Sequence, residues 1–271
     1  MLSRYVALVS DTPKVKLAEL SAVAAAVQKQ VTRDFGPIWG VQGNVAAFAR
    51  LEDVPLDYWP VIIKETLERP GAAGYHEDSS GEPTALVLAT DDWSITASHE
   101  TLELLADPWG RHLVAGESPS HSGNRVKFLV EVCDPCSNAS YTVNGIAVSD
   151  FYTPHFFDPV ATSGVRYSYA GSLGEPRHVL KGGYLSWYDP ALRAWWHRAW
   201  FGGRRHKDAA IPIPPLVQGN IRSAIDRHLR HKYGIIKRTG GGGAASQHDN
   251  TSGAAFANRA KDLRMAIDAR R

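Results

Sequence analysis

The chain has 271 residues, of which 44% are hydrophobic and 21% are charged, and its formal net charge at pH 7 is +2. This length and composition predict an ordinary soluble protein with one large domain, or one domain with extensions. No apolar run approaches the roughly 20 residues that span a bilayer, which argues against a membrane protein. The opening MLSRYVALVSDTPK lacks the features of a secretory signal peptide, so we expect a cytoplasmic protein.

The small net charge hides a strong asymmetry along the chain. Residues 1–197 contain 15 basic and 23 acidic residues, a net charge of −8, whereas residues 198–271 contain 15 basic and 5 acidic residues, a net charge of +10. The basic C-terminal part is therefore a place where an anionic partner can bind.

In the first half of the chain, hydrophobic patterning predicts strands and helices in alternation. A strand is expected at 4–10 and a helix at 14–35, ending before Gly36-Pro37. Further strands are expected at 44–51, 58–65 and 84–90. A second helix at 94–106 should stop at Asp107-Pro108, because the residue before proline avoids the helical region.

The second half reads first as β-rich and then as helical. Strands are expected at 125–133, 140–151 and 182–189, with Asn144-Gly145 as a hairpin turn. A helix is expected at 220–234, with an apolar stripe of Ile221, Ile225 and Leu229 and with Arg222, Arg230 and Lys232 away from it. We therefore divide the chain into a main domain at 1–215, a basic helical extension at 216–238 and a tail at 239–271.

The tail contains four consecutive glycines, and a polar stretch connects them to a short amphipathic helix from about Phe256. Such a composition favours a flexible linker followed by a helix that forms when its apolar stripe is covered. Its positive charge and its stripe favour docking onto a protein assembly, and more weakly onto nucleic acid.

The most informative motif lies in the second predicted helix, where His99-Glu100-Thr101-Leu102-Glu103 differs by one residue from the zinc signature H-E-x-x-H. On a helix, His99, Glu103 and Asp107 fall within roughly 80° of one another, with Glu100 at the edge of that face. His99 and Glu103 are thus candidate metal ligands. Glu100 is the candidate general base that takes a proton from a water held by the ion.

An alternative interpretation needs no metal. In it, His99 lines a core helix and the two glutamates are solvated, since acids on helices are common and the motif is short.

The stretch at 71–103, in which a glycine-rich strand is followed by another strand and then by the motif helix, resembles the zincin metallopeptidases. The segments VTRDFGPIWG, GYHE, TASHETLELLADP, EVCDPC and VSDFYTPHFF are similar to those of an uncharacterised group of bacterial and phage-associated proteins. The resemblance covers residues 20–160. It implies an α+β, zincin-like fold with a small mixed sheet and an active-site helix, a zinc peptidase acting on a peptide or protein substrate, and incorporation into a phage particle as an alternative location.

The sequence departs from the zincin pattern at Glu103, where the motif has a second histidine. A carboxylate is an acceptable zinc ligand, but it lowers the charge on the ion and suits manganese or iron somewhat better. Weaker Lewis acidity, or loss of catalysis with retention of the fold, is the expected consequence.

Several residues compete for the third ligand position. Asp107 has suitable spacing, Glu131 and Asp134 lie downstream, and His76 lies in GYHE beside Tyr75, whose hydroxyl is a candidate donor to a developing oxyanion. For each of these, an ordinary structural role is an equally open interpretation.

Two other sequence patterns favour a structural role over a catalytic or ligand-binding one. Cys133 and Cys136 form a C-x-x-C that supplies half of a zinc site or a disulfide, but two small residues at a tight turn are the preferred interpretation. The segment 188–207 mixes tryptophans with arginines in a way that suits nucleic acid, but an aromatic face packed on the core is more common. Two hypotheses therefore remain: a metal-dependent peptidase, and a catalytically silent protein that docks through its basic C-terminal region.

Overall fold

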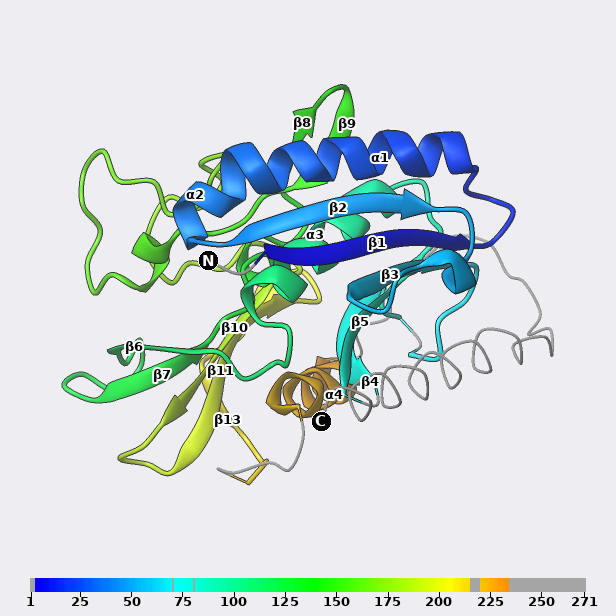
Figure 1. Cartoon of the computed structure of the whole chain (residues 1–271). Helices are drawn as coiled ribbons and strands as arrows, with labels where there is room; N and C mark the ends of the chain where they lie inside the picture. Colours follow the sequence, from blue (N-terminus) through cyan, green and yellow to red (C-terminus); the bar gives the residue numbers. More distant parts are fainter. Residues whose placement is uncertain (1–2, 70, 80, 215–219, 234–271) are drawn as a thin grey trace, which may run out of the picture.

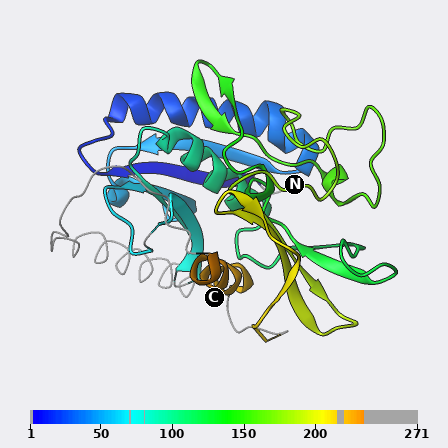
Figure 2. The same cartoon turned by 180° about the vertical axis from the view of Figure 1, so that it is seen from behind.

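The computed structural model describes residues 3–69, 71–79, 81–214 and 220–233. These residues form two main sheets, a small hairpin and a few helices, which confirms an α+β architecture at the coarse level. Figures 1 and 2 show the first sheet with α1 along one side and the second sheet extending away from it. The expected tail at 239–271 lies outside the described residues.

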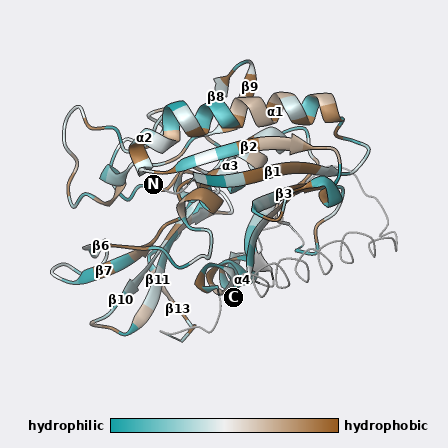
Figure 3. Ribbon diagram, in the orientation of Figure 1, coloured by the Kyte–Doolittle hydropathy of each residue, from teal (hydrophilic) through white to brown (hydrophobic). Residues whose placement is uncertain are grey.

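The first sheet has five strands in the order β2-β1-β3-β5-β4. β1 pairs in parallel with β2 and β3, β3 pairs in parallel with β5, and β4 is an antiparallel edge strand. Residues 6–9 of β1 are buried, as expected for a central strand, and β1 is largely hydrophobic in Figure 3. The strands are β1 (Ser3–Asp11), β2 (Gln42–Phe48), β3 (Tyr58–Lys64), β4 (Gly74–Ser79) and β5 (Glu82–Leu88).

Two helices cover the same face of this sheet. α1 (Leu17–Lys29) and α3 (Trp93–Ala106) contribute to one hydrophobic core with the inward-facing residues of β1, β3 and β5. A side-chain hydrogen bond joins the two helices directly, from Trp93 Nε1 to Glu19 Oε1 at 2.8 Å, and a second one joins α3 to the residue that follows α1, from Ser98 Oγ to Gln30 Oε1 at 2.7 Å. α3, which carries the motif, is therefore fixed from both the sheet and α1.

The first helical segment extends further than the sequence predicts. A π-helical stretch at Gln30–Phe35 leads into α2 (Gly36–Trp39), so the chain stays helical past Gly36-Pro37. Pro37 lies in the first turn of α2, where its missing amide hydrogen costs little. The segment ends at Gly40, whose φ of 64° gives the left-handed cap that favours glycine.

The second sheet is antiparallel and contains the aromatic segment. β11 alternates buried and less buried positions, with Trp195 buried and Arg198 partly buried beside Asp208. Trp195 and Phe201 thus pack on the core, as the structural interpretation predicts, whereas Trp196 and Trp200 lie on the less buried face of β11 together with Arg198. The strands are β6 (Leu113–Glu117), β7 (Arg125–Leu129), β10 (Tyr184–Asp189), β11 (Ala194–Phe201), β12 (Arg204–Arg205) and β13 (Ala209–Ile211).

A small hairpin and several short turns complete the described fold. The predicted hairpin is confirmed as β8 (Ser140–Val143) and β9 (Ile146–Ser149), with positive φ at Asn144 and Gly145. Single 3-10 turns occur at Leu51–Asp53, Asp134–Cys136 and Pro154–Phe157. None of the described helices is both long and apolar enough to cross a membrane.

The last described helix, α4 (Ile221–Tyr233), packs between β4 and the second sheet (Figures 1 and 2). Ile225 and Leu229 are buried against Leu129 and Trp195. The expectation that Arg222 lies away from the apolar stripe is wrong: the residue is only 3% exposed. Spacings of three and seven residues put it on the same face as Ile225 and Leu229, and buried carboxylates compensate its charge.

Candidate functional site

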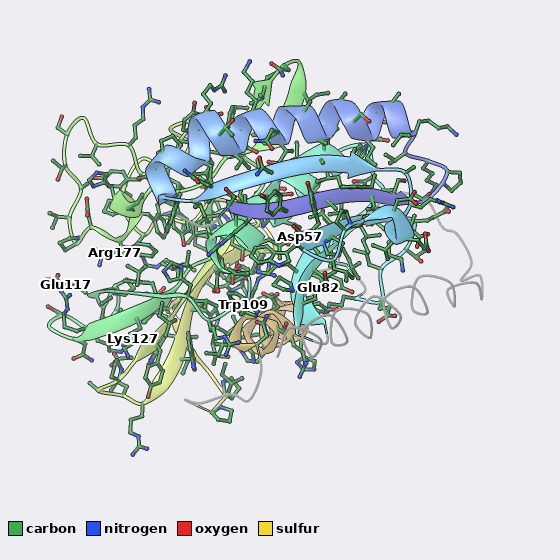
Figure 4. The ribbon with its side chains drawn as sticks, in the orientation of Figure 1. Asp57, Glu82, Trp109, Glu117, Lys127 and Arg177 are labelled. Carbon is green, nitrogen blue, oxygen red and sulfur yellow. The ribbon has the colours of Figure 1, made fainter. Side chains whose placement is uncertain are left out.

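The motif on α3 forms part of a buried cluster of charged side chains contributed by four separate segments. α3 supplies His99, Glu100 and Glu103, β4 supplies His76, the segment after β7 supplies Glu131 and Asp134, and α4 supplies Arg222. Trp109, labelled in Figure 4, lies in the loop after α3, and in the same loop Gly110 O accepts a hydrogen bond from Arg222 N at 3.3 Å. That loop therefore anchors the start of α4 beside the motif.

One group of possible metal ligands consists of His99, Glu103 and Asp134. His99 Nε2 lies 3.4 Å from Glu103 Oε1 and 3.4 Å from Asp134 Oδ1. The helical spacing of four places His99 and Glu103 on one face of α3, and the 3-10 turn at Asp134–Cys136 brings in Asp134. The His99 side chain is 18% exposed and that of Asp134 13%, so this group has partial access to solvent.

A second group consists of His76, Glu100 and Glu103, all of them buried. His76 Nδ1 lies 3.3 Å from Glu100 Oε2 and 3.6 Å from Glu103 Oε2. Glu103 belongs to both groups, with one oxygen directed to each. Because β4 is the edge strand that runs alongside α3, the two groups lie next to each other.

Arg222 is the central cation of the cluster. Its Nη2 lies 3.0 Å from Glu103 Oε2, and its Nη1 donates a hydrogen bond to His76 O at 2.8 Å. Its Nε lies 2.8 Å from Glu131 Oε2, a distance typical of an ion pair although the atoms are not aligned as a hydrogen bond. The α4 helix is thus tied electrostatically to α3, β4 and the segment after β7.

Burial and neighbouring charges separate the pKa values of the two glutamates of the motif. Burial raises the pKa of Glu100 to about 7, and Arg222 only partly opposes this. Burial also acts on Glu103, but the charges of His99 and Arg222 outweigh it and hold the pKa of Glu103 well below its usual range. The surroundings therefore favour the ionised form of Glu103, while the pKa of Glu100 lies near neutral pH.

The pKa values of the two histidines are shifted in opposite directions. Burial, assisted by the positive charge of Arg222, keeps the pKa of His76 well below its usual value. Burial also disfavours the charged form of His99, but Glu103 and Asp134 more than offset this and raise its pKa well above the usual value. His76 is a neutral imidazole, and a metal that binds His99 must displace its proton.

Glu131 belongs to the cluster but to neither possible ligand group among the described residues. Its carboxylate faces Arg222, and within the described part of the chain both oxygens are buried without an aligned hydrogen-bond partner. Burial raises its pKa well above the usual value. The structure thus favours Asp134 over Glu131 as the acid that joins His99 and Glu103.

Asp107 lies at the margin of the cluster, where its backbone faces His76, but among the described residues its carboxylate belongs to neither group of possible metal ligands. Tyr75 is directed away from the cluster. Asp107 ends α3, and its carboxylate accepts a hydrogen bond from the backbone nitrogen of His112 at 2.8 Å. Tyr75 alternates with His76 on β4 and so points to the opposite side of the strand, where Arg69 stacks over its ring at 3.8 Å. Neither residue supports its expected role as ligand or oxyanion donor.

The two cysteines are buried and are not bonded to each other. Cys133 contributes to the site through its backbone, since its nitrogen donates to Glu103 Oε1 at 3.2 Å. In the described part of the chain neither thiol belongs to a group of possible metal ligands. The turn that the sequence predicts here is present as the 3-10 turn Asp134–Cys136.

Sequence reasoning missed Arg222. The available signal is its position three residues before Ile225 and seven before Leu229, which places a basic residue within an apolar helix face.

Comparison of the chain with protein-family models, with curated proteins and with solved structures gives no match. Inferences about function therefore depend on the geometry of the cluster.

Proposed function

We propose that the protein is a metal-dependent peptidase in which His99, Glu103 and Asp134 hold a divalent ion. The observation that supports this most strongly is the convergence of their ligand atoms, all within 4.8 Å of one another. One imidazole nitrogen and two carboxylate oxygens form a donor set that zinc accepts. Manganese and iron suit the two carboxylates as well.

The distances within this group fit an ion. Two ligands bound at about 2.1 Å with a tetrahedral angle lie about 3.4 Å apart, and both His99 separations are 3.4 Å. In addition, Asp134 Oδ2 is a buried oxygen with no hydrogen-bond partner among the described residues. An acceptor in this state is costly to bury unless a ligand uses it.

When bound, the ion supplies a Lewis acid that polarises the scissile carbonyl and acidifies a coordinated water. The residue that we assign as general base is Glu100, which follows His99 on α3 and whose pKa of about 7 suits proton exchange near neutral pH. The backbone of β4 positions it, since Glu100 fits against Gly74, where a side chain would collide with it. Glu100 can therefore take a proton from water and pass it to the leaving amine.

The element order supports a zincin-like version of this proposal. A strand and a helix are followed by further strands and then by the motif helix, as in the resemblance described from the sequence. The edge strand is β4 rather than the strand directly before the helix. A peptide is the substrate class that this resemblance favours.

The proposal is tested by metal analysis of the full chain purified without chelators. We expect one equivalent of metal, lost in His99→Ala and Asp134→Asn and kept in Asp107→Asn. Peptide hydrolysis should be abolished in the first two variants. Absence of metal from the wild-type protein, after exposure to zinc or manganese, would overturn the assignment.

One observation favours a second candidate function. Arg222 and the raised pKa of His99 already supply positive charge to Glu103 and Asp134, so the cluster is partly neutralised without an ion. This suits a catalytically silent protein that contacts an assembly or an anionic partner through its basic C-terminal region. A wild-type protein that binds no metal and hydrolyses no peptide supports this alternative.

A further inference from the structure

Glu103 connects two separate positions for a cation. Its Oε1 faces His99 at 3.4 Å and accepts the backbone hydrogen bond from Cys133. Its Oε2 faces His76 at 3.6 Å and Arg222 at 3.0 Å. A carboxylate whose two oxygens serve different partners has the arrangement of a bridging ligand.

The second position has the dimensions of a metal site. His76 Nδ1 lies 3.3 Å from Glu100 Oε2 and 3.6 Å from Glu103 Oε2, close to the roughly 3.4 Å expected for tetrahedral ligands. The side chain of His76 is fully buried, and that of Glu131, which also faces Arg222, is 5% exposed, with neither oxygen hydrogen-bonded to any residue that the structure describes. Buried acceptors of this kind require a positive group beside them.

Arg222 supplies that positive group. Its Nη2 lies 3.0 Å from Glu103 Oε2 and 3.7 Å from Glu100 Oε2, the two carboxylate oxygens that face His76. The guanidinium cannot move away freely, because Nη1 is bonded to His76 O and the side chain is 4% exposed. A divalent ion and this guanidinium therefore compete for the same oxygens.

We propose that Arg222 acts as a tethered cation in the second position of a two-cation centre bridged by Glu103, and that its removal opens a second divalent-metal site at His76, Glu100 and Glu103. The inference deepens the proposed function, on which it rests only through the shared ligand Glu103. Arg222 thereby sets the metal stoichiometry of the cluster. It also leaves Glu100 free of an ion, as a general base requires.

The test counts metal ions in the full chain after equilibration with Mn²⁺ or Zn²⁺ and removal of loosely bound ions. Arg222→Met keeps an unbranched apolar stem but removes the charge, and it should bind one ion more than the wild-type protein. Arg222→Met/His76→Ala should lose that additional ion. Arg222→Lys, which keeps a cation on α4, should bind the same number of ions as the wild type.

A second measurement addresses folding, since removal of Arg222 leaves buried carboxylates without a partner. The Tm of Arg222→Met should fall in chelator and rise again with Mn²⁺, whereas the Tm of Arg222→Met/His76→Ala should fall without recovery. The proposal is overturned if Arg222→Met binds no additional ion, if that ion persists without His76, or if the variant stays unfolded with and without metal.

These outcomes are distinct from failure of the peptidase proposal. If the wild-type protein binds no metal but Arg222→Met binds one ion that depends on His76, the tethered cation is supported and the peptidase assignment fails. If the wild-type protein binds one ion that depends on His99 and Arg222→Met binds no more, the peptidase assignment stands and the tethered cation fails.

Discussion

Arg222 and Glu103 are 119 positions apart in the chain, yet Arg222 Nη2 lies 3.0 Å from Glu103 Oε2. Their side chains are 4% and 0% exposed. A buried charge of this kind is strongly destabilising without its partner. The helix α4 is therefore part of the charged cluster, and we expect variants of either residue to change both metal binding and stability.

Replacement of Glu103 tests the bridging ligand. Glu103→Ala should weaken metal binding by on the order of 100-fold or more and should destabilise the fold by about 3–5 kcal/mol, because Arg222 loses its closest partner. Glu103→His should retain zinc, since it restores the H-E-x-x-H pair. Metal titration and urea denaturation measure the two effects. Unchanged metal affinity in Glu103→Ala would place the ion elsewhere.

Glu100→Gln tests the general base. The variant preserves side-chain size and should keep its metal content, while peptide turnover falls by on the order of 10²-fold or more. In the wild-type protein, turnover should rise with pH as Glu100 loses its proton, and the residual activity of Glu100→Gln should lack this step. Equal turnover in the two proteins would rule out the role.

Gly74→Ala tests how β4 positions the base. An added Cβ would lie 2.5 Å from Thr96 Cγ2 and 2.9 Å from Glu100 Oε1. We expect a destabilisation of about 1–3 kcal/mol, because α3 and β4 must separate, together with reduced activity. Gly174→Ala is the matched control, since no atom lies within 4 Å of its Cβ position. A fully stable and active Gly74→Ala would show that Glu100 is not held by this contact.

The buried side chain of His197 should make the stability of the folded protein depend on pH. Burial lowers the pKa of His197 to about 4, and its Nε2 lies 2.6 Å from the hydroxyl of Tyr233 on α4. Between pH 6.5 and 4 the unfolded chain binds the proton more readily than the folded one, so stability falls as pH drops through this window. The full effect is at most about 3 kcal/mol.

Denaturant titrations at several pH values between 7 and 4 measure how steeply the free energy of unfolding changes with pH, which is the slope to be compared among variants. His197→Gln should reduce this slope without abolishing it, because the amide does not titrate, whereas the lowered pKa of the buried His76 contributes a slope of the same sign. His155→Gln, at an exposed histidine 3.0 Å from Asp158, is the control and should retain the slope. A wild-type slope that persists undiminished in His197→Gln would assign the effect to another group.

Truncations separate α4 from the tail. Removal of 239–271 should leave the Tm nearly unchanged, as the sequence composition predicts, and should weaken any partner contact in a salt-sensitive way. Removal of 220–271 should lower the Tm strongly, because Arg222, Ile225 and Leu229 are buried. Equal Tm values for the two truncations would show that α4 does not stabilise the rest of the fold.

The regular elements of the fold were predictable where the local pattern is strong. The strands around 4–10, 58–65 and 84–90 and the helix at 94–106 follow from short-range hydrophobic periodicity, and all are present. The extension of the first helical segment to Trp39 was missed, because Gly36-Pro37 is a common helix boundary and only tertiary packing keeps it helical. β11 was missed as a strand because tryptophans occur on both of its faces, so its sequence does not alternate between apolar and polar residues.

The sequence by itself determined that His99 and Glu103 share one face of a helix with Glu100 beside them, because four-residue spacing is a property of the helix alone. Only the tertiary structure decided which distant groups join them. It selected Asp134 over Asp107 and Glu131, brought His76 from the edge strand, and buried Arg222 among the acids. Pairing of charges across such separations leaves no local pattern, since it depends on how strands and helices pack rather than on their order.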